Sequence, residues 1–131
     1  MIVLDASALA EYLAGSRVGA EVHRLVVRDG GPVHLPHLAV AETASVFRAT
    51  AARGRLDPRL AEDALGDLAA FPAVIHDGRP FLARVWALRH AVTAYDAFYI
   101  ALAEALDSPL ITLDARLGRA HGHSARVTML A

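Results

Sequence analysis

The stretch at residues 2–4 constrains the fold of this chain more than any other. Its three residues, Ile-Val-Leu, are consecutive, bulky and apolar, and two of them are β-branched. Such a run is typical of a strand that is buried on both faces, as in a parallel sheet covered by helices. Asp5 follows where the strand leaves the core, and open α/β sheets bind ligands beyond the carboxyl ends of such strands. Asp5 is therefore a candidate functional residue, although Asp5 or Ser7 could instead cap a helix over residues 8–14.

The length and composition favour one domain over residues 1–131, which would bury about two thirds of its unfolded surface. The chain has no cysteine, which excludes disulfide and thiolate chemistry and fits a reducing cytoplasm. Its first nine residues lack a basic segment, so we do not expect a signal peptide. No apolar run approaches the roughly 18 residues of a membrane span. We therefore expect a cytoplasmic protein with no membrane partner.

The charge is nearly balanced, with a formal net value of −1, so nothing pulls the whole chain toward nucleic acid. All 13 basic residues are nevertheless arginine, whose guanidinium forks suit phosphate groups. A local RNA-binding surface and a bias in codon composition explain this count equally well. The apolar content of 55% is above the usual share and suggests hydrophobic surface kept for a partner.

Helical and strand patterns alternate along the rest of the chain. We expect helices over residues 7–14, 18–27, 37–53, 57–71, from 80, 93–106 and 115–120, and strands over 33–35, 74–75, 110–113 and 127–130. Strands that alternate with helices imply right-handed crossovers and a mostly parallel sheet.

The helix expected over residues 37–53 has two sides of interest. One stripe contains Glu42 among residues that are mostly small, namely Leu38, Ala41, Ser45, Ala49 and Ala52. The opposite side is apolar and includes Val40, Phe47 and Ala51. We expect this apolar side to contact a partner, either a second copy or another protein.

Four acids stand at comparable places: Asp5 and Asp114 after buried strands, Glu42 in a helix, and Asp96 near a helix start. Each has an ordinary explanation, since Asp114 could cap a helix, Thr93 and Asp96 could form a capping box, and Glu42 could pair with an arginine such as Arg53. If the acids converge, each charge pair 4 Å apart repels by roughly 4 kcal/mol at an effective dielectric near 20. A divalent cation would remove that repulsion. Oxygen ligands without histidine or cysteine select Mg²⁺ or Mn²⁺.

The chain resembles the PIN-domain ribonucleases, and specifically the VapC toxins of bacterial toxin–antitoxin pairs. The resemblance is carried by Ile-Val-Leu-Asp-Ala-Ser-Ala-Leu at residues 2–9, Val-Ala-Glu-Thr-Ala around Glu42, Tyr-Asp-Ala-Phe-Tyr at 95–99, and Thr-Leu-Asp at 112–114 with Arg116-Leu117. It spans the whole chain, and the Tyr-Asp-Ala and Thr-x-Asp blocks are specific in this order and spacing. None of the family's acids is missing.

The resemblance implies a three-layer α/β/α sandwich with a mostly parallel central sheet, which cleaves RNA internally with Mg²⁺ or Mn²⁺. The family's catalytic and metal-binding acids correspond to Asp5, Glu42, Asp96 and Asp114, and its accessory hydroxyls to Ser7 and Thr112. Products with a 5′-phosphate and a 3′-hydroxyl, a homodimer, and a VapB-like antitoxin that covers the site are also implied. One or two ions, and direct or water-mediated binding by Asp114, both stay open.

Other protein classes fit less well. A response-regulator receiver needs an acid pair at its first strand and a later lysine, whereas Asp5 has no acidic neighbour and the chain has no lysine. A haloacid-dehalogenase-like phosphatase needs Asp-x-Asp, and here the sequence is Asp5-Ala6-Ser7. The remaining alternative is a catalytically silent PIN-like module that binds RNA or a partner. We expect the seven histidines to be solvated or capping residues without a catalytic role.

Overall fold

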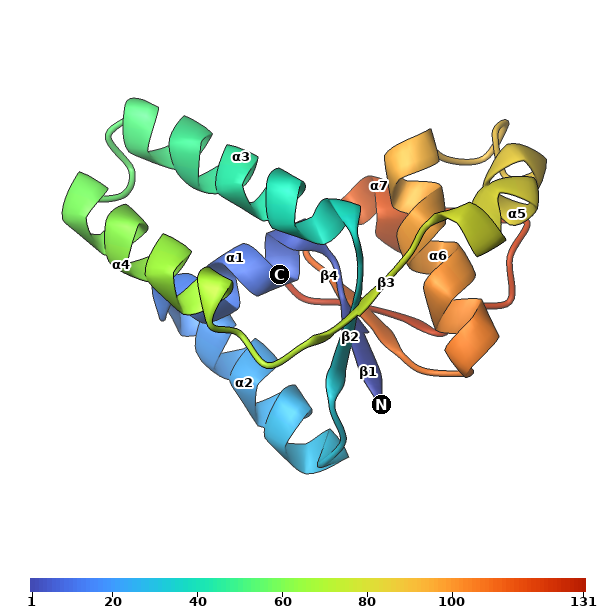
Figure 1. Cartoon of the computed structure of the whole chain (residues 1–131), viewed down its shortest axis with the longest axis horizontal. Helices are drawn as coiled ribbons and strands as arrows, with labels where there is room; N and C mark the ends of the chain where they lie inside the picture. The colour runs from blue at the N-terminus through green and yellow to red at the C-terminus, as the bar shows by residue number, and fades with distance from the viewer.

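A five-stranded, entirely parallel sheet forms the middle of the computed structural model, which describes residues 1–131 (Figure 1). The strand order is β3-β2-β1-β4-β5, so the first strand is the central one. The strands are β1 (Ile2–Leu4), β2 (Val33–Pro36), β3 (Val74–His76), β4 (Leu110–Thr112) and β5 (Val127–Met129). The prediction of a parallel sheet is confirmed, including an edge strand at the end of the chain.

Helices cover both faces of this sheet, which makes the three-layer α/β/α sandwich that was expected. They are α1 (Ala6–Ala14), α2 (Arg17–Asp29), α3 (Leu38–Ala52), α4 (Pro58–Ala69), the 3₁₀ turn η1 (Arg79–Phe81), α5 (Leu82–Ala87), α6 (Ala94–Leu106) and α7 (Ala115–Gly118). Helices α1 and α2 lie on one side of the strands, and α5 and α6 lie on the other (Figure 1). None of the helices combines the length and the apolar composition that a membrane span requires.

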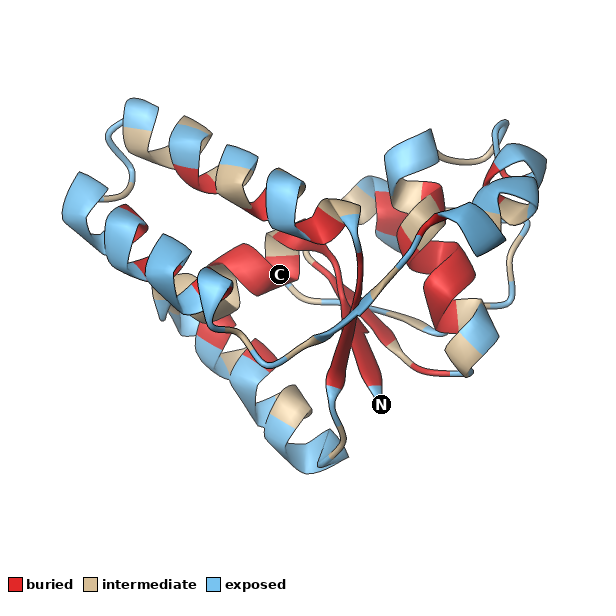
Figure 2. Cartoon of the chain, in the orientation of Figure 1, coloured by how far each residue is buried: buried red, intermediate tan, exposed pale blue.

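The core is centred on β1, in which every residue is buried, and on α6, which has six buried residues (Figure 2). Val3 and Leu4 are completely buried because β2 and β4 flank β1 and helices cover both of its faces. Val3 pairs with Leu110 of β4, and Leu4 pairs with Ile111. This register brings the carboxyl ends of β1 and β4 to the same level, and that is where the site is built.

The connection between α1 and α2 depends on two glycines. Gly15 ends α1 in the left-handed conformation, with φ of 68°, which glycine adopts without steric cost. Ser16 then caps α2, since its hydroxyl accepts a hydrogen bond from the Gly19 amide at 3.1 Å. Gly19 faces α1 so closely that a Cβ atom there would lie 2.0 Å from the carbonyl oxygen of Glu11. The two helices can cross at this distance only because residue 19 has no side chain.

Helices α3 and α4 form a pair that extends beyond the sheet and packs on α1 (Figure 1). Phe47 is only 2% exposed because it packs with Ala10 of α1 and with Ala61 and Ala64 of α4. The prediction that Phe47 lies on an outward, partner-binding side of this helix is therefore wrong. Of that apolar side, Val40 is the residue that stays clearly exposed.

The stripe of mostly small residues that contains Glu42 is not the buried side of the same helix. The buried positions of α3 are Ala39, Thr43 and Phe47, whereas Ala41 and Ser45 face outward. Because this helix is rich in small residues on every side, periodicity alone did not identify the face that α1 and α4 cover.

His34 contradicts the expectation that the histidines are solvated or capping. It lies on β2 between β1 and β3 and is 7% exposed. Its Nδ1 is 2.7 Å from Nε2 of His76, on the neighbouring strand. A polar side chain on an inner strand needs such a partner because water cannot reach it.

Candidate active site

Three of the four predicted acids line one cavity of about 610 Å³ beside the carboxyl end of the sheet. Glu42 reaches it from the second turn of α3, Asp96 from the first turn of α6, and Asp114 from the loop after β4. Asp5 does not line this cavity. It lies at the end of β1, is 5% exposed, and acts electrostatically on each of the other three acids.

Hydroxyl groups on both sides hold the Asp5 carboxylate in place. The Ser7 hydroxyl donates to Oδ1 of Asp5 at 2.6 Å, and the Ala8 amide donates to the same oxygen at 2.9 Å. The Thr112 hydroxyl donates to the other oxygen, Oδ2. Asp5 therefore caps α1 and is fixed in orientation at the same time.

The two hydroxyls also connect the end of β1 to the loop after β4. The Ser7 oxygen accepts a hydrogen bond from the Leu113 amide at 2.9 Å, and the Thr112 oxygen accepts one from the Asp114 amide at 2.9 Å. Each hydroxyl thus donates to Asp5 and accepts from the segment that carries Asp114. This arrangement sets the position of Asp114 relative to Asp5.

Glu42 is held by a residue whose role the sequence did not reveal. The hydroxyl of Tyr99 donates to Oε1 of Glu42 at 2.7 Å, and Tyr99 is itself 1% exposed in the core. Tyr99 stands three residues after Asp96, so the two share a side of α6. The spacing of three residues from Asp96 was the sequence signal that could have identified Tyr99 as a site residue. The alternative of a Glu42–Arg53 ion pair is not realised.

The capping explanations are correct for two of the acids and incomplete for a third. Asp5 caps α1, and Asp114 caps α7 by accepting from the Arg116 amide at 2.8 Å. At α6 the Thr93 hydroxyl accepts from the Asp96 amide at 3.2 Å, but the reciprocal bond of a capping box is not formed. The Asp96 carboxylate is thus not required to cap its helix.

Burial and, to a smaller extent, crowding raise the pKa of three of these acids. Burial raises the pKa of Asp96 to about 6, and the charges of Asp114, Asp5 and Glu42 add to the effect. Burial also raises the pKa of Asp5, against the lowering effect of the Ser7 and Thr112 hydroxyls. The pKa of Glu42 is raised by burial too, although the Tyr99 hydroxyl lowers it. The fold thus places these carboxylates in surroundings that disfavour their charged form.

This donor set fits a hard divalent cation. All of the candidate ligands are carboxylates, and a cation would offset both the burial of their charges and their mutual repulsion. No three acidic or histidine side chains gather tightly enough to hold one ion together. Mg²⁺ does not need them to, because it keeps several waters and is usually held by one or two carboxylates together with substrate phosphates.

Seven other residues line the same cavity, and none of them was predicted as a site residue. Four of the seven have a charged, imidazole or aromatic side chain. They are Arg89, His90, Tyr95 and Arg116. Arg116 and Tyr95 lie directly beside the acidic motifs, so their position next to Asp114 and Asp96 was the signal. Cations and an aromatic ring around a group of acids are the composition of a site for a polyanion.

Comparison with known proteins decides the family. The family model described as "PIN domain" matches residues 2–122. This chain belongs to the PIN-domain family. Among curated PIN relatives, Ribonuclease VapC12 of Mycobacterium tuberculosis is 35% identical over 131 residues and covers 100% of both chains. Ribonuclease VapC1 of the same species is 38% identical over 133 residues, covering 98% of this chain and 96% of that one. The resemblance to VapC ribonucleases is confirmed.

Solved structures agree with the PIN fold. The crystal structure of PAE2754 from Pyrobaculum aerophilum matches with a TM-score of 0.67 at 24% identity, covering 88% of this chain and 82% of that one. VapBC2 from Rickettsia felis, bound to a DNA fragment from their promoter, matches with a TM-score of 0.69 at 12% identity over 100% of both chains. At these identities the likeness concerns the fold alone.

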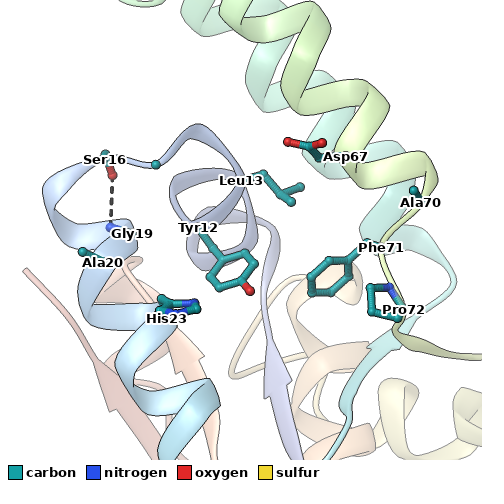
Figure 3. Close-up of a pocket in the computed structure, with 11 residues that line it drawn as sticks. Tyr12, Leu13, Ser16, Gly19, Ala20, His23, Asp67, Ala70, Phe71 and Pro72 are labelled. Carbon is teal, nitrogen blue, oxygen red and sulfur yellow. Dashed lines mark hydrogen bonds between the residues drawn. The ribbon is translucent and has the colours of Figure 1, made fainter.

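A second cavity of this PIN domain, of about 630 Å³, lies between α1, α2 and the end of α4 (Figure 3). Tyr12 is central to it, with its ring 5.7 Å from that of His23 and 5.7 Å from that of Phe71. Asp67 is the one carboxylate on its wall. This hollow is therefore aromatic in character and lacks the acids that a cation site needs.

Proposed function

We propose that the chain is a metal-dependent endoribonuclease, the toxin of a VapBC-type pair, acting on RNA in the cytoplasm. The observation that carries the proposal is the cavity lined by Glu42, Asp96 and Asp114, with Asp5 fixed behind it. The VapC ribonucleases that are 35% and 38% identical to this chain support the same activity. Hydrolysis of a phosphodiester by water is the reaction for which an all-carboxylate site is suited.

Each acid has a role that its surroundings suggest. Asp96 and Asp114 have carboxylates on the cavity wall and would bind Mg²⁺ or Mn²⁺ directly. Asp5, oriented by Ser7 and Thr112, would complete the negative charge from behind. Glu42 would bind the ion or take the proton of the attacking water, because its raised pKa makes its carboxylate a better base than an ordinary glutamate.

When bound, the cation would lower the pKa of the attacking water and offset the charge that develops on the scissile phosphate. The protein's own contribution is to keep the carboxylates positioned before RNA arrives. The paired Ser7 and Thr112 hydroxyls and the Tyr99 hydroxyl perform this task, since they fix Asp5 and Glu42 through bonds to buried elements. Expected products carry a 5′-phosphate and a 3′-hydroxyl.

The proposed protein partners are a VapB-like antitoxin and a second copy of the chain. The buried position of Phe47 removes the predicted docking side of α3. The aromatic hollow around Tyr12 and Phe71 is the better place for an apolar side chain of the antitoxin, because it is concave and contains a single carboxylate (Figure 3).

The activity is tested by incubating RNA with the purified protein in Mg²⁺, in Mn²⁺ and in chelator. We expect internal cleavage with either ion and none in chelator. Asp96→Asn should lower the cleavage rate by at least about 100-fold, because it removes a carboxylate that would bind the cation. The same carboxylate is not required to cap α6. This variant is preferable to one at Asp5, whose carboxylate also holds the fold through three hydrogen bonds.

Asp63→Asn is the matched control, since Asp63 is exposed on α4 and away from the cavity. It should cut RNA at the wild-type rate. Cleavage by Asp96→Asn at the wild-type rate would show that the activity belongs to a contaminant, and RNA binding without any cleavage would favour the silent binding module.

A further inference from the structure

One arginine of the acidic cavity has no part in cation binding or water activation. Arg89 lines the same hollow as Glu42, Asp96 and Asp114, and it belongs to the connection between α5 and α6. When water attacks a phosphodiester, negative charge builds up on the nonbridging oxygens of the phosphate. A positioned positive charge at this place would stabilise them in addition to a metal ion.

Trp86 holds the guanidinium of Arg89 in place. The guanidinium lies 4.6 Å from the centre of the Trp86 ring, within the range of a cation–π contact. Nη1 of Arg89 donates to the Trp86 carbonyl oxygen at 2.9 Å, and the Arg89 amide donates to the same oxygen at 3.2 Å. Trp86 is itself 68% exposed and is not part of the hydrophobic core. Contact with Arg89 is therefore the interaction that accounts for this exposed ring.

Arg89 is positioned without being neutralised. No carboxylate forms an ion pair with it, although three acids line the same cavity. A guanidinium has five N–H donors, and the bond to the Trp86 carbonyl uses one of them. Nε and Nη2 stay available as a fork that matches two oxygens of a phosphate. Such a positioned and unpaired cation loses little side-chain freedom when it meets an anion.

The position of Arg89 relative to Asp96 is fixed by contacts between α5 and α6. Two hydrogen bonds of 2.8 Å join the Arg84 guanidinium on α5 to the Glu104 carboxylate on α6. Leu88, directly before Arg89, is 2% exposed and anchors the connection in the core. The donors of Arg89 are thus placed beside the acids before RNA arrives. Donors that are placed in advance stabilise a developing charge most strongly.

We propose that Arg89 is a further catalytic residue, which contacts the nonbridging oxygens of the scissile phosphate, and that Trp86 is its positioning residue. The inference rests on the proposed ribonuclease function and adds a residue to its chemistry. In the reaction the water oxygen forms a bond to phosphorus, and the proton of the water passes to Glu42. The bond from phosphorus to the 3′-oxygen breaks, and that oxygen takes a proton from solvent. Arg89 transfers no proton and meets the charge that the nonbridging oxygens gain between substrate and transition state.

The role of Arg89 is tested by separating kcat from binding. Cleavage of RNA in Mg²⁺ gives kcat and KM, and anisotropy of a labelled oligoribonucleotide on Asp96→Asn protein in chelator gives affinity without reaction. Arg89→Ala should lower kcat by about 100- to 1,000-fold, the loss expected for a donor aimed at a developing charge. In the Asp96→Asn background it should weaken affinity by only about fivefold, as for one exposed charged contact. Arg89→Lys lacks the fork and should recover a small part of the lost kcat.

The role of Trp86 is tested by rescue and by a double variant. Trp86→Ala should lower kcat by roughly 2- to 30-fold, the range that corresponds to the loss of one cation–π contact. Trp86→Phe keeps an aromatic face and should restore most of this loss. Because Trp86 acts through Arg89, the double variant Trp86→Ala, Arg89→Ala should have the same kcat as Arg89→Ala alone.

Two controls match these variants. Leu82 is 54% exposed on α5, four residues before Trp86, and does not line the cavity. Arg59 is exposed on α4, also away from the cavity. Leu82→Ala and Arg59→Ala should both cut RNA with the kcat of the wild type.

If the wild type cuts RNA and Arg89→Ala has the same kcat, the ribonuclease function stands and the inference fails. Equal losses of kcat/KM and of affinity, with kcat unchanged, would also overturn it, because Arg89 would then only bind. Multiplied losses in the double variant would show that Trp86 acts independently of Arg89, which contradicts its positioning role. A wild type that cuts no RNA in Mg²⁺ or Mn²⁺ would overturn the ribonuclease proposal and this inference together.

Discussion

At the scale of single residues, Asp5 shows that a helix cap and a site residue can be the same side chain. One of its oxygens accepts from the Ala8 amide of α1, and the other accepts from Thr112 on the adjacent strand. Its negative charge reaches Glu42 and Asp96, where it contributes to their raised pKa values. The capping interaction therefore positions the charge and does not compete with it.

Tyr99→Phe tests the residue that holds Glu42. Phenylalanine keeps the buried ring, so we expect to lose only about 1 kcal/mol of stability with the hydrogen bond. The Tyr99 hydroxyl lowers the pKa of Glu42, so the pKa should rise further without it. More Glu42 is then protonated at low pH, and cleavage should fall more at pH 6 than at pH 8. The measurement is the pH–rate profile, whose acidic limb should move to higher pH.

Tyr12→Phe is the comparison for this variant, because Tyr12 lies in the aromatic hollow and not in the acidic cavity. It should leave the profile unchanged. If Tyr99→Phe also leaves it unchanged, Glu42 takes no part in the proton transfer of the reaction.

At the scale of elements, the order of helices and strands was predictable and the packing of α3 was not. Buried strands such as residues 2–4 and 110–112 are apolar over at least two consecutive positions, and caps such as Asp57-Pro58 mark helix starts. Helix α3 has small residues all round, so its buried side depends on α1 and α4. Which side of α3 is buried is decided by contacts with elements that are distant in the sequence. Local sequence patterns carry no information about those contacts.

The same limit applies to the site. All four acids were predicted, and three of them line one cavity. Tyr99 and Arg89 were missed because their roles depend on side-chain directions, toward Glu42 in one case and over Trp86 in the other. Residue type and spacing do not fix those directions.

Gly19→Ala tests how closely α1 and α2 must pack. The new Cβ would lie 2.0 Å from the Glu11 carbonyl oxygen and 2.6 Å from its carbon, so the helices would have to separate. We expect a loss of about 1–3 kcal/mol in the free energy of unfolding, measured by urea titration. Ordinary helix propensity predicts the opposite sign, a gain of roughly 0.5–1 kcal/mol.

Gly66→Ala provides that opposite case in the same protein. Gly66 lies within α4, and a Cβ there would meet nothing within 4 Å. This variant should gain stability. If Gly19→Ala gained as much, close packing of α1 and α2 would not be the reason for glycine at position 19.

At the scale of the whole molecule, the central position of β1 explains why residues far apart in sequence act together. Parallel strands end at the same edge, so Asp5 and the loop with Asp114 meet there. Helices α3 and α6 bring Glu42 and Asp96 to that edge. The fold thus gathers like charges, which costs stability that a cation would restore.

The most direct test of this account compares wild-type unfolding with that of Asp96→Asn, in chelator and in Mg²⁺ or Mn²⁺, at pH 7.5 and pH 5.5. The folded pKa of Asp96 is about 6, above its unfolded value near 3.8. The stability that protonated Asp96 contributes to the folded state is therefore fully present below the unfolded pKa, and it is lost as the pH rises through 6. For this half-exposed group the change is on the order of 1 kcal/mol after solvent screening.

Acidification over the same pH range lowers stability through His34, because burial lowers the pKa of His34 and the folded state resists its protonation. Both proteins contain His34, so the difference between them isolates Asp96. In chelator, wild type should gain stability relative to Asp96→Asn as the pH falls from 7.5 to 5.5. At pH 7.5 the metal ion should stabilise wild type and have much less effect on Asp96→Asn. A variant that loses stability yet keeps the full metal response would contradict the account, because Asp96 would then be a structural residue outside any cation site.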